Sequence, residues 1–167
     1  MKKVLRILFK ILELFPSFGT PIKVVNFENL IKEFEKRGDL EKAREVRTTA
    51  LKTIPTSHHG PLLRSEGEDK LYKQKDYRGA LKAFEKAITA MEQSPSLLGV
   101  TAPDRIYAGA AQAALFLGDK EKATKYYFEF ASLVVKFSEN KKLEKALKWH
   151  RDTLKYLESQ LMSAHKS

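Results

Sequence analysis

The sequence predicts an all-α protein, and two patterns support this prediction. Apolar residues recur at three- and four-residue steps along most of the chain, which is the spacing of amphipathic helices. No stretch of useful length alternates apolar and polar residues with period two, so no β-sheet is expected. With 167 residues, of which 43% are hydrophobic, the chain can form one domain, 1–167, around a continuous core.

Helix breakers divide this domain into segments. A first amphipathic helix ends near Phe15, because residues 16–21 hold two prolines and a glycine and predict a loop. Turns at Gly38-Asp39, Asp76 and Gly118-Asp119 then separate the members of three helix pairs. The pairs and the last helix are expected at 24–55, 62–92, 104–136 and 141–162.

The three turns share one pattern, in which an aspartate precedes an alanine by four residues. The pairs are Asp39 and Ala43, Asp76 and Ala80, and Asp119 and Ala123. Each aspartate can cap the amino terminus of the following helix, and each alanine lets two helices pack closely. In two of the three turns a glycine directly precedes the aspartate, and glycine readily adopts the left-handed conformation of a tight turn.

The segments RGDLEKA, KQKDYRGALKAFEKAI and LGDKEKATKYY resemble the tetratricopeptide repeat, whose unit is a pair of antiparallel helices of about 34 residues. The resemblance covers about Phe27 to Val135. The chain departs from the family pattern where Arg47 replaces an expected aromatic residue and where longer spacing indicates inserted loops. The resemblance implies a right-handed superhelix of about three antiparallel helix pairs, with an extra helix at each end.

In proteins of this kind the first helices of the repeats form a concave surface that binds ligands. The resemblance therefore implies exposed partner-binding side chains on the first helices, namely Glu28, Asn29, Lys32, Asp69, Lys73, Arg105 and Gln112. The sequence does not favour the subclass of these proteins that binds the terminal carboxylate of a peptide. The acidic Glu28 stands where that subclass has a cation or an amide, and its charge would repel the carboxylate.

The first helix is apolar around most of its circumference, so it must be buried somewhere. Its contact residues are expected to be Leu5, Leu8, Phe9, Leu12 and Phe15. It could cap the first repeat, form a homodimer contact or lie on a membrane surface, the last being less favoured than a protein partner. It is too short to span a bilayer. The last helix carries a heptad pattern that suits either capping or a coiled-coil seam.

The charge of the chain favours an anionic partner. Lys and Arg outnumber Asp and Glu by 31 to 21, although such an excess also serves solubility alone. The preferred function is a non-enzymatic adaptor whose basic surface docks on a ribosome or another RNA–protein assembly, with RNA contacts through Lys and Arg. The alternative is a peptide-binding scaffold, tethered to a membrane surface or dimerised through the first helix.

Enzymatic chemistry is not expected. The chain has no cysteine, which excludes disulfides and thiol nucleophiles and fits a cytoplasmic protein. Neither a Gly-rich phosphate cradle nor a nucleophile, base and acid set occurs, so no catalytic residue and no cofactor are predicted. His58 and His59 lack the further ligands of a zinc site, and His150 suits a packed position on the last helix, so no metal is predicted.

Overall fold

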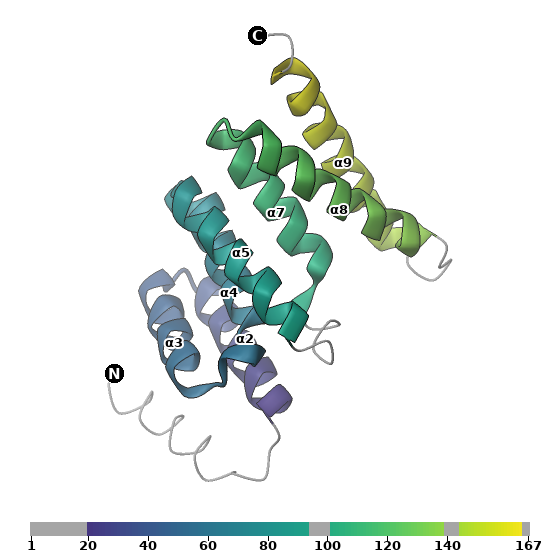
Figure 1. Cartoon of the computed structure of the whole chain (residues 1–167). Coiled ribbons are helices and arrows are strands. Elements are labelled where there is room, and N and C mark those ends of the chain that lie inside the picture. Colours follow the sequence, from purple (N-terminus) through teal and green to yellow (C-terminus); the bar gives the residue numbers. More distant parts are fainter. Residues whose placement is uncertain (1–19, 94–100, 139–143, 165–167) are drawn as a thin grey trace.

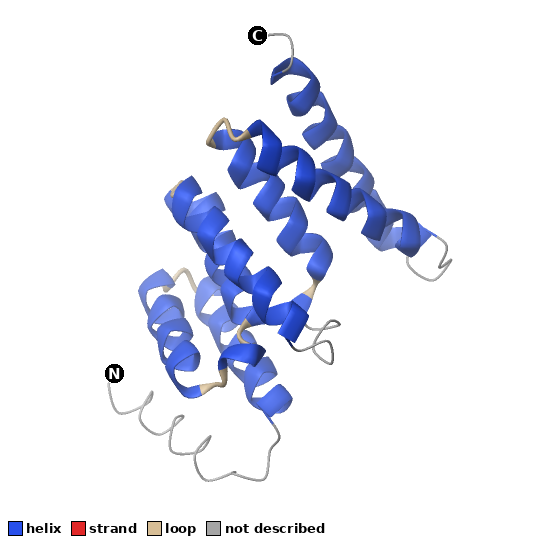
Figure 2. Cartoon of the chain, in the orientation of Figure 1, coloured by secondary structure: helices blue, strands red, loops and turns tan. Residues whose placement is uncertain are grey.

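The computed structural model describes residues 20–93, 101–138 and 144–164, and every regular element in this part of the chain is a helix, joined by short turns (Figures 1 and 2). The all-α prediction is therefore confirmed. The predicted contact residues of the first helix, Leu5 to Phe15, lie outside the described residues. The elements are α2 (Thr20–Lys36), α3 (Leu40–Thr53), η1 (Thr56–His58), α4 (Gly60–Glu68), η2 (Asp69–Gln74), α5 (Tyr77–Gln93), α7 (Pro103–Phe116), α8 (Lys120–Ser138) and α9 (Glu144–Ala164).

The long helices form three hairpins, α2 with α3, α4 with α5, and α7 with α8, while α9 packs against α8 and α7 (Figure 1). The first hairpin begins at Thr20, although the sequence predicts a loop up to Pro21. Proline fits here because the first turn of a helix does not need its missing N–H. None of the described helices is long and apolar enough to cross a membrane.

The predicted helix caps are present in all three hairpins. The side chains of Asp39, Asp76 and Asp119 each accept a backbone N–H from the residue three positions later, at 3.3, 2.9 and 3.0 Å. The alanine four residues after each aspartate is at most 1% exposed. Each second helix is therefore started by its aspartate and packs closely at its alanine.

The turn of the second hairpin differs from the other two. Gly38 and Gly118 have φ angles of +75° and +73°, as the turn pattern predicts, but Lys75 takes the same left-handed conformation without being a glycine. The residues before it, Asp69–Gln74, form a π-helix in place of the predicted α-helix. The backbone N–H groups of Lys75 and Asp76 both donate to the carbonyl of Lys70, which closes this wide turn.

The larger apolar core lies between α5, α7, α8 and α9, and Phe84 is at its centre with no exposed surface. Its ring sits between Gly67 on α4 and Gly109 on α7. A Cβ atom at Gly67 would lie 2.7 Å from the ring, and one at Gly109 would also collide with it. The two glycines therefore make the space that lets α4 and α7 close on Phe84.

A second, separate apolar core belongs to the first hairpin. It contains Val24, Phe27, Ile31 and Val46 of α2 and α3, joined by Leu62 of α4. Leu62, together with Leu51 of α3, which packs against both cores, links the first hairpin to the second through apolar contacts, and the ionic contacts described below add to this link.

Candidate functional site

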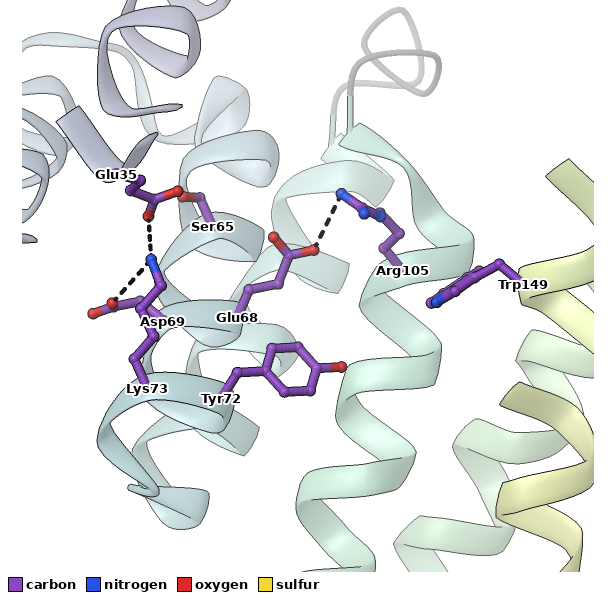
Figure 3. A pocket seen from close by; sticks show the side chains of 8 residues that line it. All are labelled: Glu35, Ser65, Glu68, Asp69, Tyr72, Lys73, Arg105 and Trp149. Carbon is purple, nitrogen blue, oxygen red and sulfur yellow. Dashed lines mark ion pairs between the residues drawn. The ribbon is translucent and has the colours of Figure 1, made fainter. Parts of the chain in front are cut away.

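A groove with a volume of about 290 Å³ opens between the first hairpin, η2, α7 and α9 (Figure 3). The first helix of every hairpin and α9 all contribute to it. Its lining residues are Glu35, Ser65, Glu68, Asp69, Tyr72, Lys73, Arg105 and Trp149. Segments far apart in the sequence therefore meet at one site.

Two large aromatic side chains stand exposed in the groove. Tyr72 is 51% exposed and Trp149 is 43% exposed, and they project into the space between η2, α7 and α9 (Figure 3). Tyr156 follows Trp149 by seven residues, so both lie on the same side of α9. Burial and then the charge of Glu68 raise the pKa of Tyr72, and nearby Tyr156 contributes to the same increase.

The polar hydrogens of these aromatic residues are available to a ligand. Among the described residues, no protein group hydrogen-bonds to the hydroxyl groups of Tyr72 and Tyr156 or to the indole N–H of Trp149. Each group is a hydrogen-bond donor on a half-exposed ring. Tyr72 and Trp149 in the groove, and Tyr156 near Tyr72, thus combine apolar ring surface with hydrogen-bond donors that no described protein group uses.

The charged residues of the groove are paired with one another. The Nζ atom of Lys73 lies 3.1 Å from Oε1 of Glu35 and 3.7 Å from Oδ1 of Asp69 (Figure 3). On the other side, Nη1 of Arg105 lies 3.7 Å from Oε1 of Glu68. Three carboxylates face two cations here, so the lining carries no excess of positive charge.

Behind the groove, a layer of buried charges joins the first hairpin to the second. This ionic layer consists of Glu28, Arg47, Arg64 and Asp69, each at most 5% exposed. Nη2 of Arg64 donates to Oε1 of Glu28 at 2.5 Å, and Nη1 of Arg64 lies 3.2 Å from Oε1 of Glu68. Buried cations of this kind need their counterions, because desolvation is costly.

The other half of the ionic layer surrounds Asp69. Nε of Arg44 donates to Oδ2 of Asp69 at 2.9 Å, and Nη1 of Arg47 lies 3.9 Å from the same oxygen. Burial raises the pKa of Asp69, but the hydrogen bonds from Arg44 and Gln74 and the charges of both arginines outweigh it and leave the pKa below its ordinary value. Burial lowers the pKa of Arg47, opposed by the charges of Asp69 and Glu35.

The structure corrects the predicted exposure of two of the candidate binding residues. Glu28 and Asp69 are not exposed as predicted, because each is a buried counterion of an arginine between the hairpins. Of the remaining predicted residues, Lys73 and Arg105 line the groove with Asp69. Asn29 and Lys32 are exposed on α2 outside its lining, and Gln112 is half-buried on α7.

Tyr72, Tyr77 and Trp149 are aromatic residues of the type that stacks on nucleic-acid bases, and the structure separates them. Tyr72 and Trp149 line the groove. Tyr77 instead stacks on Phe116, with ring centroids 4.5 Å apart. Tyr156 is not among the predicted binding residues, although its seven-residue spacing from Trp149, off the leucine stripe of α9, is a signal that could have identified it.

His59 and His150 take structural positions. His150 is 7% exposed and packs against Phe130 and Phe137, and its Nε2 atom lies 2.9 Å from Oδ2 of Asp104, so its predicted packed position is confirmed. His59 lies 2.7 Å from the carbonyl of Ile54. Across residues 20–93, 101–138 and 144–164, no group of three or more His, Cys, Asp or Glu side chains is placed to hold a metal.

Comparison with known proteins identifies no relative. No family model matches the sequence, and no curated protein or solved structure matches the chain. The function is therefore inferred from the groove and the charged surfaces themselves.

Proposed function

We propose that this protein is a non-enzymatic binding scaffold of the tetratricopeptide kind, a right-handed superhelix of stacked hairpins that holds a polypeptide segment of a partner in the groove. One observation carries the proposal. The first helix of every hairpin and α9 converge on a single groove in which Tyr72 and Trp149 stand exposed. Exposed tyrosine and tryptophan side chains in such a depression are the residue types that dominate binding energy at protein interfaces.

The charge of the groove favours a polypeptide over a nucleic acid. Binding of a phosphate backbone depends on an excess of Lys and Arg that displaces counterions. Here Glu35, Glu68 and Asp69 outnumber Lys73 and Arg105, and the cations already have carboxylate partners. A polypeptide can instead use the aromatic surface without bringing further negative charge into the groove.

The test is selection of random peptides on the protein, followed by affinity measurements on a variant with Tyr72→Ala and Trp149→Ala. We expect the selected peptides to bind the wild type and to lose most of their affinity for this variant. The control is Phe128→Ala, which removes a 64% exposed aromatic residue on α8 that does not line the groove. Peptides that bind all three proteins equally would place recognition elsewhere and refute the proposal.

A second candidate function uses the basic surface. Arg78, Lys82 and Lys86 recur at four-residue steps on the exposed side of α5, about 6 Å apart along the helix axis. None of the three has an ion-pair partner among the residues that the structure describes. This basic row supports docking on an anionic assembly such as a ribonucleoprotein, independently of what the groove binds.

Salt dependence tests the basic row. Replacing its three residues with glutamine should reduce the slope of log K against log salt concentration for single-stranded RNA by about 2, at roughly 0.7 for each phosphate contact. The groove variant should keep the wild-type slope. An unchanged slope in the triple variant would exclude the basic row as the RNA contact.

Docking through the first helix, as a membrane tether or a dimer contact, concerns residues outside the described part of the chain. Deletion of residues 2–15 tests it. Loss of liposome binding would support the tether, and a change from dimer to monomer in sedimentation would support the dimer contact. Unchanged behaviour in both assays would remove this alternative.

A further inference from the structure

We infer that the π-helix η2 holds one extra residue relative to the other two hairpins, and that this insertion positions Tyr72 and Lys73 in the groove. This inference rests on the proposed function, since it concerns the side chains that the bound segment would meet. Three observations point to it: the spacing of buried residues before each turn, the backbone hydrogen bonds that close the turns, and the groove residues that η2 supplies.

The second hairpin has one more residue before its turn than the other two have. In the first and third hairpins a buried residue of the first helix, Ile31 or Ala111, stands eight positions before the capping aspartate. In the second hairpin the corresponding buried residue is Gly67, which stands nine positions before Asp76. The residue four positions before each of these three is apolar or aromatic and buried or half-buried: Phe27, Leu63 and Tyr107. The helices are therefore in register up to Gly67, and the extra residue falls between Gly67 and Asp76.

The backbone hydrogen bonds of the turns show the same extra residue. In the first and third hairpins the N–H of the capping aspartate donates to the carbonyl group five positions earlier, at 2.9 and 3.0 Å. In the second hairpin the N–H of Asp76 donates to the carbonyl group of Lys70, six positions earlier, at 3.0 Å. A π-helix bonds residues five apart where an α-helix bonds residues four apart, so one turn of it accommodates a single added residue. The π-helix thus keeps the helix before it and the turn after it in place.

The widened turn supplies a large part of the groove. Asp69, Tyr72 and Lys73 belong to η2 and are three of the eight residues that line it (Figure 3). Nε2 of Gln74 donates to Oδ2 of Asp69 at 2.5 Å, and Nε of Arg44 donates to the same oxygen at 2.9 Å, so the π-helix is tied both to itself and to the first hairpin. Short π-helical turns of this kind occur frequently at functional sites.

Without the extra residue, the groove would have a different lining. Glu68 and Tyr72 both face the groove and are four positions apart across the widened turn. In a shortened, α-helical turn they would be three positions apart, and the ring of Tyr72 would point in a different direction relative to Glu68. The insertion therefore matters to the groove more than to the core, which the other two hairpins build without it.

Deletion of Lys70 tests this inference, because it restores the spacing of the other hairpins without removing a groove residue. Lys70 does not line the groove, and its one ion pair among the described residues is with Glu66, where both side chains are 27% exposed. We expect the deletion variant to keep its helical circular dichroism and cooperative urea unfolding. We also expect peptides selected on the wild type to bind it about tenfold more weakly, measured by isothermal titration calorimetry.

The control is Lys70→Ala, which removes the same side chain but keeps the length of the turn. It should bind the selected peptides as the wild type does. A folded deletion variant with wild-type affinity would overturn the inference. A deletion variant that fails to fold would also overturn it, since the extra residue would then be required by the hairpin itself and not by the groove.

The variant with Tyr72→Ala and Trp149→Ala separates this inference from the proposed function. If that variant loses the selected peptides while the deletion variant binds them as the wild type does, the insertion does not shape the groove and the proposed function stands. If both variants lose them and Lys70→Ala does not, both are supported. If the variant lacking the two aromatic rings binds the peptides as the wild type does, the proposed function and the inference fail together.

Discussion

Removal of one charge from the ionic layer should strongly destabilise the protein, and Glu28→Gln is the sharpest case. The side chains of Glu28 and Arg64 are 6% and 5% exposed and meet at 2.5 Å. In the variant, the buried Arg64 keeps only Glu68, at 3.2 Å, and its Nε atom already has no hydrogen-bond partner. Breaking a buried ion pair from one side costs about 3–5 kcal/mol. Because Glu68 remains, we expect a loss of about 3 kcal/mol in the free energy of unfolding.

The assay is urea unfolding followed by circular dichroism. A loss of about 3 kcal/mol corresponds to a melting temperature lower by about 6–12 °C for a chain of this size. The control is Glu33→Gln, which removes an exposed partner of Arg37 and should cost at most about 0.5 kcal/mol. Replacing Glu28 and Arg64 together with leucine should recover most of the loss, because no unpaired buried charge remains.

Two results would refute this reasoning. The first is a Glu28→Gln protein within about 0.5 kcal/mol of the wild type, which would mean that water solvates Arg64 and that the layer is not a dry interface. The second is a double leucine variant as unstable as the single variant, since the loss would then reflect packing and not an unpaired charge.

Three further predictions concern the backbone, the core and alkaline pH. Gly109→Ala should lower the free energy of unfolding by about 1–3 kcal/mol in urea, because its methyl group collides with Phe84, and an unchanged value would contradict this packing. Lys75→Gly should raise it by about 0.5–1 kcal/mol, since glycine relieves the left-handed backbone, and a loss would contradict that strain. Burial, and then the charge and hydrogen bond of Glu85, raise the pKa of Tyr126 to about 12. Its contribution to stability is therefore complete below pH 10 and lost as the pH rises toward 12, so Tyr126→Phe should reduce the alkaline loss of stability in urea titrations, and an equal loss in both proteins would contradict the pKa shift.

The helices and their caps could be predicted from sequence because they depend on nearby residues. A cap such as Asp119 acts on a backbone N–H three positions away, and Gly118 sets the turn beside it. Periodicity over one or two turns is enough to recognise such segments. The position of Lys75 shows the limit of this reasoning, because a left-handed lysine after a π-helix leaves no compositional signal.

The ionic layer could not be predicted because its pairs are distant in sequence. Glu28 and Arg64 are 36 positions apart, and a glutamate at the edge of an apolar stripe looks like an ordinary exposed residue. Only the approach of the first two hairpins turns it into a buried counterion. Asp69 was misjudged for the same reason, since Arg44 lies 25 positions away.

The groove was partly predictable. Lys73 and Arg105 belong to first helices, where the resemblance to tetratricopeptide repeats places ligand contacts, and both line the groove. The contribution of α9 was not predicted as a binding surface, because its leucine pattern describes only the buried side of the helix. Trp149 lies away from that stripe and becomes part of the groove lining only when α9 packs on α8 and α7.

The measurement that tests the central claim most directly is the affinity of a library-selected peptide for wild-type protein and for Trp149→Ala, determined by isothermal titration calorimetry. If the groove is the binding site, the loss of this aromatic residue should weaken binding about 30-fold, corresponding to about 2 kcal/mol, while Phe128→Ala binds as the wild type does. Equal affinity for wild type and Trp149→Ala would contradict the account.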